Sequence, residues 1–166
     1  MADISSDSAE LAAVVSTPFG SVEIISRGDG VERLRLVAHP AKSVILKSTA
    51  PVESVYASLL AYIQHRHWTS FDGALDGLGL TRFQRQIYVG LNQISFGQTM
   101  TYGALARELK TGPRALAGAL RRNPLPILMP CHRVLAASGI GGFMGSTSGD
   151  ALVIKRWLIN HEKRAE

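Results

Sequence analysis

The sequence of 166 residues contains one cysteine, Cys131, and lacks any apolar run near the roughly 20 residues that a membrane-spanning helix needs. One cysteine excludes an internal disulfide framework and any zinc site that requires two or more thiolates, and we predict no metal site. The first ten residues also lack the basic start and apolar stretch of a signal peptide. We therefore expect a cytoplasmic protein.

Acidic residues are scarce in the second half of the chain. Residues 1–77 hold six basic and nine acidic residues, a net charge of −3, whereas residues 78–166 hold twelve basic and four acidic residues, a net charge of +8. Such asymmetry favours a polyanionic partner for the second half, although a solvated basic surface without a partner explains it equally well. Hydrophobic residues make up 46% of the chain, which indicates a globular fold of one domain or two small ones.

The first part of the chain predicts strands followed by a helix. Apolar runs separated by glycine-rich turns favour a hairpin, and Pro51 opens a helical pattern with Val52, Val55, Leu59, Tyr62 and Ile63. The expected segments are a flexible leader (1–15), turns (17–20 and 27–30), strands (22–25, 31–37 and 43–46) and a linker (68–79). We expect one domain over residues 1–77 and a second over residues 78–166.

The second part reads as helical. Thr81 and Thr101 are residue types that cap helices, and Pro113 suits the first turn of another helix. The first of these helices carries an apolar face of Phe83, Ile87, Leu91 and Ile94. Two short helices, over residues 102–109 and 113–122, are joined by a tight turn, which is the outline of a helix-turn-helix.

The helix over residues 113–122 has one apolar and one small, basic face. Leu116 and Leu120 are four residues apart and can face the core, whereas Arg114, Gly118 and Arg121 fall on another side. Arginine can neutralise phosphates or reach into a groove, so this face favours nucleic-acid binding. Tight packing of a small-residue helix in a core is the alternative.

A candidate nucleophile follows the buried run of residues 125–129. The thiolate is the reactive form of cysteine, and the neighbouring His132 can act as its base while Arg133 adds a positive field. Alternatively, Cys131 is an inert buried residue. Neighbours in an extended strand point to opposite faces, so contact between Cys131 and His132 requires a turn or a bridging water.

The motif Pro130-Cys131-His132-Arg133-Val134 resembles the active-site signature of the O6-alkylguanine-DNA alkyltransferases, the methylated-DNA–protein-cysteine methyltransferases. Flanking residues follow the same order as in that family, and the resemblance covers residues 79–162. The flanking matches are Phe83-Gln84, Gly97, Thr101-Tyr102-Gly103, Arg114-Ala115, Gly118, Asn123-Pro124, Lys155, Trp157-Leu158 and Glu162. Residues 1–77 are covered weakly, chiefly by Thr17-Pro18-Phe19-Gly20 and the hairpin after it.

The resemblance implies a self-inactivating DNA repair protein. It would move the alkyl group of O6-alkylguanine, and of O4-alkylthymine, from duplex DNA to Cys131 without a cofactor. His132 would act as base through water, Glu162 would orient His132, Asn123 would serve as a hinge, and Tyr102 would protonate the leaving base. The implied DNA-binding residues are Tyr102, Gly103, Arg114, Ala115, Gly118 and Arg121, and the implied pocket residues are Val134, Phe143, Met144, Gly145 and Lys155.

The resemblance also implies the architecture: a small ribonuclease-H-like α/β N-terminal domain, followed by a helical winged-helix or helix-turn-helix DNA-binding domain. The implied partner is double-stranded DNA carrying alkylated guanine, bound by a monomer that can cooperate with its neighbours and associate with the nucleoid. The chain departs from the family at Phe143, where a tyrosine is usual, and in a longer loop over residues 146–150. The alternatives are a non-catalytic lesion-binding protein of the alkyltransferase-like type and, less consistent with the charge, a thiol hydrolase.

Overall fold

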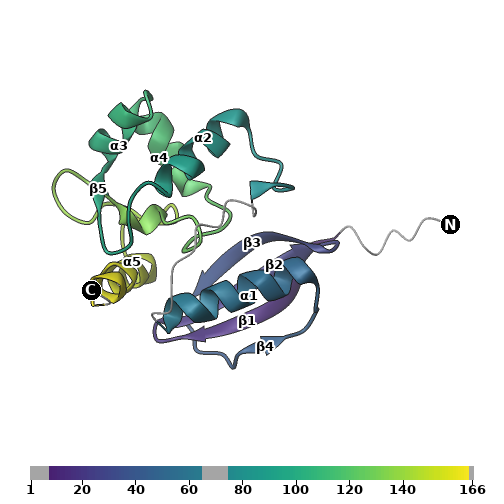
Figure 1. Cartoon of the computed structure of the whole chain (residues 1–166). Helices are drawn as coiled ribbons and strands as arrows, with labels where there is room; N and C mark the ends of the chain where they lie inside the picture. The colour runs from purple at the N-terminus through teal and green to yellow at the C-terminus, as the bar shows by residue number, and fades with distance from the viewer. Residues whose placement is uncertain (1–7, 65–74, 165–166) are drawn as a thin grey trace. The chain divides into compact units, whose positions relative to one another are not determined.

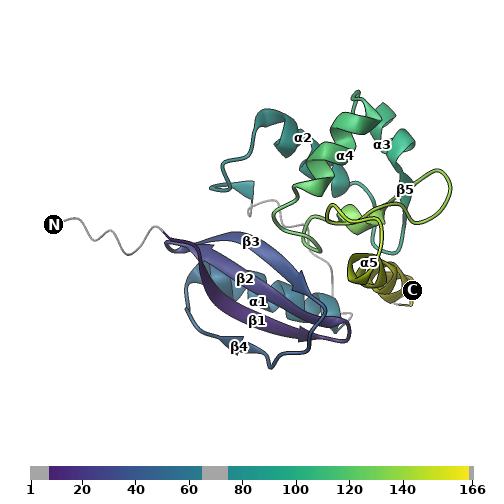
Figure 2. The same cartoon turned by 180° about the vertical axis from the view of Figure 1, so that it is seen from behind.

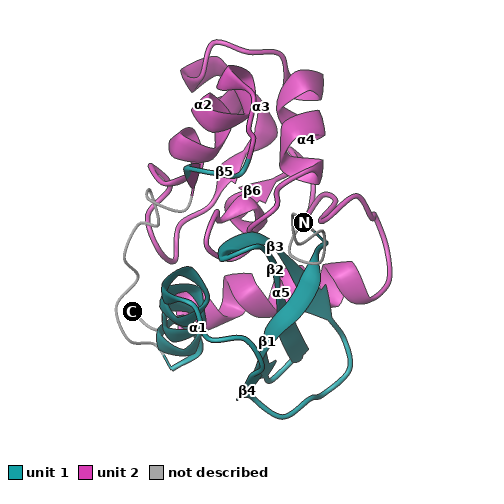
Figure 3. Cartoon of the chain, turned by 90° about the vertical axis from the view of Figure 1, so that its right-hand side faces the viewer, with its two compact units in different colours: residues 1–69, 76–78 teal, residues 70–75, 79–166 magenta. Residues whose placement is uncertain are grey.

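The computed structural model describes residues 8–64 and 75–164, and the chain forms two compact units. Residues 1–69 with 76–78 form one unit, and residues 70–75 with 79–166 form the other (Figure 3). Most of the predicted linker over residues 68–79 lies outside the described residues. Within the described ranges, no helix is long and apolar enough to cross a membrane.

A four-stranded antiparallel sheet forms the framework of the first unit. Its strands lie in the order β3-β2-β1-β4, with β1 (Glu10–Thr17), β2 (Gly20–Arg27), β3 (Gly30–Val37) and β4 (Val44–Ile45). Tight turns join β1 to β2 and β2 to β3, as the sequence predicts. The hairpin and the short fourth strand are therefore confirmed.

The prediction of a flexible leader over residues 1–15 is wrong from Glu10 onward. Residues 10–15 belong to β1, which lies between β2 and β4. Ala12, Ala13, Val14 and Val15 are all buried, and because successive side chains of a strand point to opposite faces, both faces of this stretch are covered. A strand at this position is buried on both faces, so it shows a continuous apolar run rather than the alternation that marks a half-exposed strand.

Helix α1 (Ala50–Ile63) covers one face of this sheet (Figures 1 and 2). The Thr49 side chain caps the helix by accepting a hydrogen bond from Val52 N, and Pro51 lies in the first turn. The predicted apolar residues Val52, Val55, Leu59 and Tyr62 are buried, whereas Ile63 is only partly covered. The helical periodicity of the sequence therefore identified the packed face.

The described residues of the second unit contain four α-helices: α2 (Arg82–Leu91), α3 (Tyr102–Glu108), α4 (Pro113–Arg121) and α5 (Asp150–Lys163). Thr81 forms a capping box with Gln84, and Thr101 caps α3, as expected. Helices α3 and α4 pack together in the predicted helix-turn-helix order.

The apolar face of α2 differs from the prediction. The helix ends at Leu91, so Ile94 reaches the core from the following turn. Tyr88 is buried together with Ile87 and Leu91, whereas Phe83 is 38% exposed. Tyr88 shifts the buried face around the helix, away from the side on which Phe83 lies.

A short parallel strand pair interrupts the helical unit. β5 (Met100–Thr101) pairs with β6 (Val134–Leu135), with Met100 opposite Val134. The sequence led us to expect an all-helical second unit, and this strand pair shows that expectation to be wrong. Because β5 leads into α3 and β6 directly follows Cys131–Arg133, this pair brings the start of α3 beside the cysteine turn.

The hairpin of β1 and β2 yields a stability prediction. Gly20 has φ +138°, and a Cβ atom there would lie 2.1 Å from Val37 O. We expect Gly20→Ala to destabilise the protein by more than about 1 kcal/mol, measured by chemical denaturation. The matched control is Gly30→Ala, whose Cβ would meet only Arg27 O at 3.8 Å; a similar loss in both variants would contradict the prediction.

Candidate active site

Cys131 begins a single turn of 3-10 helix, Cys131–Arg133. Arg133 N donates to Pro130 O at 3.0 Å, and Cys131 N donates to Met129 O at 2.7 Å. Successive side chains of a 3-10 helix leave the axis in three directions. The turn that the sequence requires is thus present, and all three of its side chains are buried.

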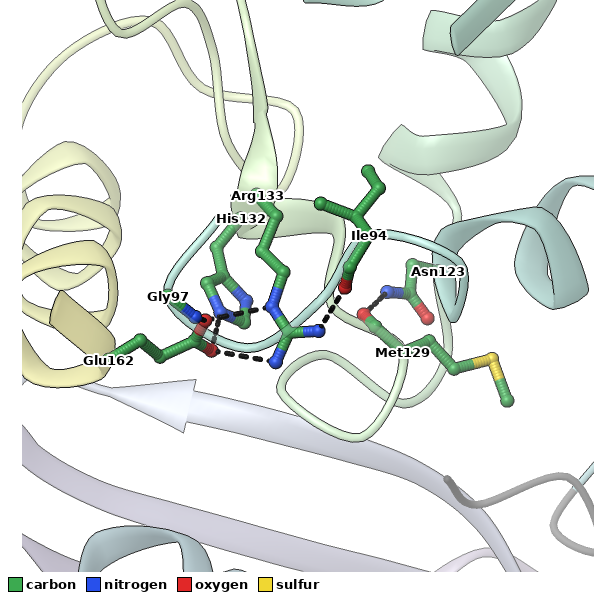
Figure 4. A network of polar contacts seen from close by, with 7 residues as sticks. All are labelled: Ile94, Gly97, Asn123, Met129, His132, Arg133 and Glu162. Atoms are coloured by element: carbon green, nitrogen blue, oxygen red, sulfur yellow. Dashed lines mark hydrogen bonds and ion pairs between the residues drawn. The ribbon is translucent and has the colours of Figure 1, made fainter. Parts of the chain in front are cut away.

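The amide of Asn123 holds the sulfur and the chain that precedes it. Asn123 Nδ2 donates to Cys131 Sγ at 3.1 Å and to Met129 O at 2.8 Å, whereas Asn123 Oδ1 accepts from Leu125 N at 3.0 Å. Both amide hydrogens and the oxygen are therefore used. Asn123 follows α4 directly, so it ties the end of that helix to the cysteine turn (Figure 4).

Burial raises the pKa of the Cys131 thiol to about 11, although the hydrogen bond from Asn123 and the charge of Lys155 both lower it. At neutral pH the sulfur is therefore protonated in the protein without DNA. The sequence led us to expect that Arg133 supplies the positive field. That expectation is wrong, because Arg133 pairs with Glu162, and the cation that acts on the thiol is Lys155.

Glu162 joins the two residues that follow the cysteine (Figure 4). His132 Nε2 lies 2.6 Å from Glu162 Oε1, and Arg133 donates to both carboxylate oxygens, at 2.8 and 3.1 Å. Gly97 N also donates to Oε2 at 3.1 Å, and Arg133 Nη1 donates to Ile94 O at 2.6 Å. Burial would raise the pKa of Glu162, but the bonds and charges of His132 and Arg133 lower it to about 2.

His132 lies beside this ionised carboxylate. Its burial lowers its pKa, against the opposing hydrogen bond and charge of Glu162. An ionised carboxylate only accepts hydrogen bonds, so His132 Nε2 carries the proton that faces Glu162. Nδ1 is then the nitrogen with a lone pair that can take up a second proton.

Lys155 is a buried ammonium group with three backbone acceptors. Its Nζ donates to Val134 O at 2.7 Å, Ile140 O at 2.8 Å and Gly142 O at 2.9 Å. Burial lowers its pKa to about 8. The three bonds match the three donors of a charged ammonium and fasten the chain after Cys131 to α5.

A cavity of about 460 Å³ opens beside the sulfur. It is lined by Tyr102, Pro113, Arg114, Ala117, Leu120, Arg121, Cys131, Ala136 and residues 141–147. The volume lies within the range of small-molecule sites. The structure thus brings Cys131 and Tyr102 together with Arg114 and Arg121 from α4.

Not every predicted pocket or DNA-binding residue lines this cavity. Val134 and Lys155 do not, because Val134 is packed in the core and the Lys155 ammonium is bound to carbonyl oxygens behind the wall. Gly103, Ala115 and Gly118 also lie outside the lining, on α3 and α4. Ala115 is exposed, and a Cβ atom at Gly118 would meet nothing within 4 Å.

A tight turn closes one side of the cavity. Phe143 and Ser146 exchange backbone hydrogen bonds of 2.8 and 2.9 Å, and Met144 and Gly145 between them have φ values of 50° and 80°. Two positive φ values indicate a type I′ turn, in which methionine is unusual, so the sequence did not predict it. A Cβ at Gly145 would lie 3.0 Å from Arg121 Nε, so the turn packs against the Arg121 side chain.

Comparison with known proteins assigns this site to a family. Residues 82–164 match the model of the 6-O-methylguanine DNA methyltransferase DNA-binding domain. A methylated-DNA–protein-cysteine methyltransferase of Thermococcus gammatolerans is 36% identical over 128 residues, 71% of this chain and 70% of the relative. The chain belongs to the 6-O-methylguanine DNA methyltransferase family.

Other members of the family cover more of the chain. A DNA base-flipping protein of Thermus thermophilus is 33% identical over 88% of this chain and 95% of its own. The Mycobacterium tuberculosis O6-methylguanine methyltransferase matches with a TM-score of 0.70 at 25% identity, over 95% of both chains. The OGT protein of the same organism, in complex with DNA, matches with a TM-score of 0.68 at 27% identity, over 92% of both.

The Glu162 cluster predicts a specific acid sensitivity. The folded-state pKa of about 2 lies below the ordinary value of 4.5, so the stability that Glu162 contributes is present above pH 4.5 and is lost as the pH falls toward 2. In urea unfolding, we expect the stability advantage of the wild type over Glu162→Gln to shrink by about 2 kcal/mol between pH 6 and pH 3. Glu108→Gln, at an exposed position on α3, is the control; a constant advantage of the wild type would refute the assignment.

Proposed function

We propose that this protein repairs DNA by moving the alkyl group of an O6-alkylguanine to Cys131, once per molecule. One observation carries the proposal: the sulfur borders a cavity, and the next residue in the chain, His132, is bound to a buried carboxylate, Glu162. A nucleophile, a base and an acid that orients the base are the groups that alkyl transfer to a thiol requires.

In the proposed reaction, the extruded base enters the cavity with its O6-alkyl carbon facing Sγ. The sulfur bonds to that carbon as the carbon–O6 bond breaks, and the electron pair goes to the guanine. The thiol proton passes through a water molecule to His132, and Tyr102 protonates the leaving guanine. His132 then gives up its extra proton and Tyr102 takes one back through water, so both return to their starting states. One alkyl group and one proton thus change places, and the thioether product leaves Cys131 with no free thiol.

The raised thiol pKa makes proton removal part of the reaction. His132 can take the proton because Glu162 stabilises the imidazolium that forms, and the Lys155 ammonium lowers the pKa of Cys131. Asn123 donates to the sulfur, and a hydrogen bond to the charged form favours that form. Three groups therefore offset the cost of forming a buried thiolate.

We also propose that α3 and α4 form the helix-turn-helix that binds duplex DNA, within a second domain of winged-helix type over residues 78–166. Arg114 would fill the space left by the extruded base, and Arg121 would lie beside the flipped nucleotide. The small residues Gly103, Ala115 and Gly118 would let both helices approach the DNA closely. The first domain, over residues 1–77, would be ribonuclease-H-like, and the protein would bind as a monomer that can cooperate with its neighbours.

A non-catalytic lesion-binding protein is the second candidate. It is favoured by the similarity, over 95% of the relative's length, to a protein named as a DNA base-flipping protein. Such a protein would bind and extrude the alkylated base without taking up the alkyl group. The two candidates differ in one measurable property, the mass of the protein after it meets the lesion.

The central prediction is a covalent one. After incubation with duplex DNA that carries O6-methylguanine, we expect the intact protein to gain the mass of one methyl group, on the peptide that contains Cys131. Cys131→Ser should bind the same duplex with unchanged affinity and gain no mass, because a serine hydroxyl is a far weaker nucleophile. Bound, folded wild-type protein that gains no mass would refute alkyl transfer and leave lesion binding as the function.

Arg114 provides a test of base extrusion. We expect Arg114→Ala to slow methyl transfer from a fully paired duplex about fivefold to tenfold, on the order of 1 kcal/mol. The defect should be smaller when the lesion lies in single-stranded DNA, where extrusion costs least. Arg33→Ala, an exposed arginine in the other unit, is the matched control. Equal defects on both substrates would contradict a role for Arg114 in extrusion.

A further inference from the structure

Tyr88 is a buried residue of α2 that the proposed reaction does not use. Its hydroxyl donates to Ala119 O at 3.0 Å, across the contact between α2 and α4. A backbone carbonyl only accepts hydrogen bonds, so the direction of this bond is fixed. Ala119 lies in the last turn of α4, and its carbonyl oxygen also accepts from Arg122 N, the residue that caps the helix, at 3.0 Å.

Tyr88 is fully buried, so the hydrogen bond to Ala119 O replaces one that its hydroxyl would otherwise make to water. Burial raises the pKa of Tyr88 to about 12, so the phenol keeps its proton at neutral pH.

The last turn of α4, which Tyr88 contacts, is followed closely in the chain by the residue that donates to the sulfur. Leu120 and Arg121 follow Ala119 and line the cavity, and Asn123 N donates to Leu120 O at 3.2 Å. The side chain of Asn123 then donates to Cys131 Sγ. Three residues thus lie between Ala119, whose carbonyl accepts from Tyr88, and Asn123, whose amide donates to the sulfur.

We infer that the Tyr88 hydroxyl is a positioning group, which holds the last turn of α4 in register with Cys131 while α4 is bound to DNA. This inference rests on the proposed function, because it requires that α4 bind the duplex from which the base is extruded. A hydroxyl that only stabilised the core would affect every reaction of Cys131 equally. A positioning hydroxyl matters most when the substrate binds both α4 and the cavity.

The test compares two substrates on one variant, Tyr88→Phe, which keeps the aromatic ring and removes the hydrogen bond. Rates of alkylation of Cys131 are measured by mass with O6-methylguanine in duplex DNA and with free O6-benzylguanine, which can enter the cavity but carries no duplex that loads the rest of α4. We expect the duplex rate to fall about threefold to tenfold, the range of one lost neutral hydrogen bond, and the free-base rate to change less than about twofold. Because both rates come from the same sample, any loss of folded protein cancels in their ratio.

The matched control is Tyr62→Phe, which removes a hydroxyl from a buried tyrosine of the other unit and should leave the ratio of the two rates unchanged. Duplex affinity should also be unchanged in Tyr88→Phe, since its surface residues are intact. Equal falls in both rates, or no fall in either, would overturn the inference. Wild-type protein that takes an alkyl group from neither substrate would instead refute the proposed function.

Discussion

The buried ion pair between Glu162 and Arg133 determines what the neighbouring histidine can do. A carboxylate shared by His132 and Arg133 stays ionised, because the guanidinium compensates its charge in a region that excludes water. His132 therefore does not have to be protonated to satisfy Glu162, which is the condition that the proposed role of His132 as a base requires. Arg133, which the motif places two residues after the sulfur, thus acts on the carboxylate that binds His132.

Three segments that are distant in the sequence meet at the cysteine turn. The β5–β6 pair sets the start of α3 beside it, Asn123 ties the end of α4 to it, and Lys155 fastens the following loop to α5. Each of these connections is made by hydrogen bonds to backbone groups or to the sulfur itself. Hydrogen bonds, and not side-chain packing alone, therefore fix the position of the sulfur. In the proposed reaction, a site held in this way keeps the nucleophile in line with the alkyl carbon.

Local patterns in the sequence predicted the hairpin, the caps at Thr81 and Thr101, and the helix-turn-helix, because each depends on residues that are close in the chain. The motif around Cys131 identified the family for a different reason, namely its specificity. The errors concern partners that only the fold selects. Strand β1 is buried on both faces, Arg133 turns to Glu162, and Lys155 lies behind the cavity wall; no spacing in the sequence encodes those choices.

The protonated state of the Cys131 thiol has a consequence for the proposed reaction, in which this sulfur reacts once. Oxidants and electrophilic metabolites attack thiolates much faster than thiols, and they must first reach the sulfur. With its proton retained and its surface covered, Cys131 is shielded from such chance encounters while the protein waits for damage. Burial slows the proposed alkyl transfer to Cys131, and the same burial keeps the thiol intact until that transfer takes place.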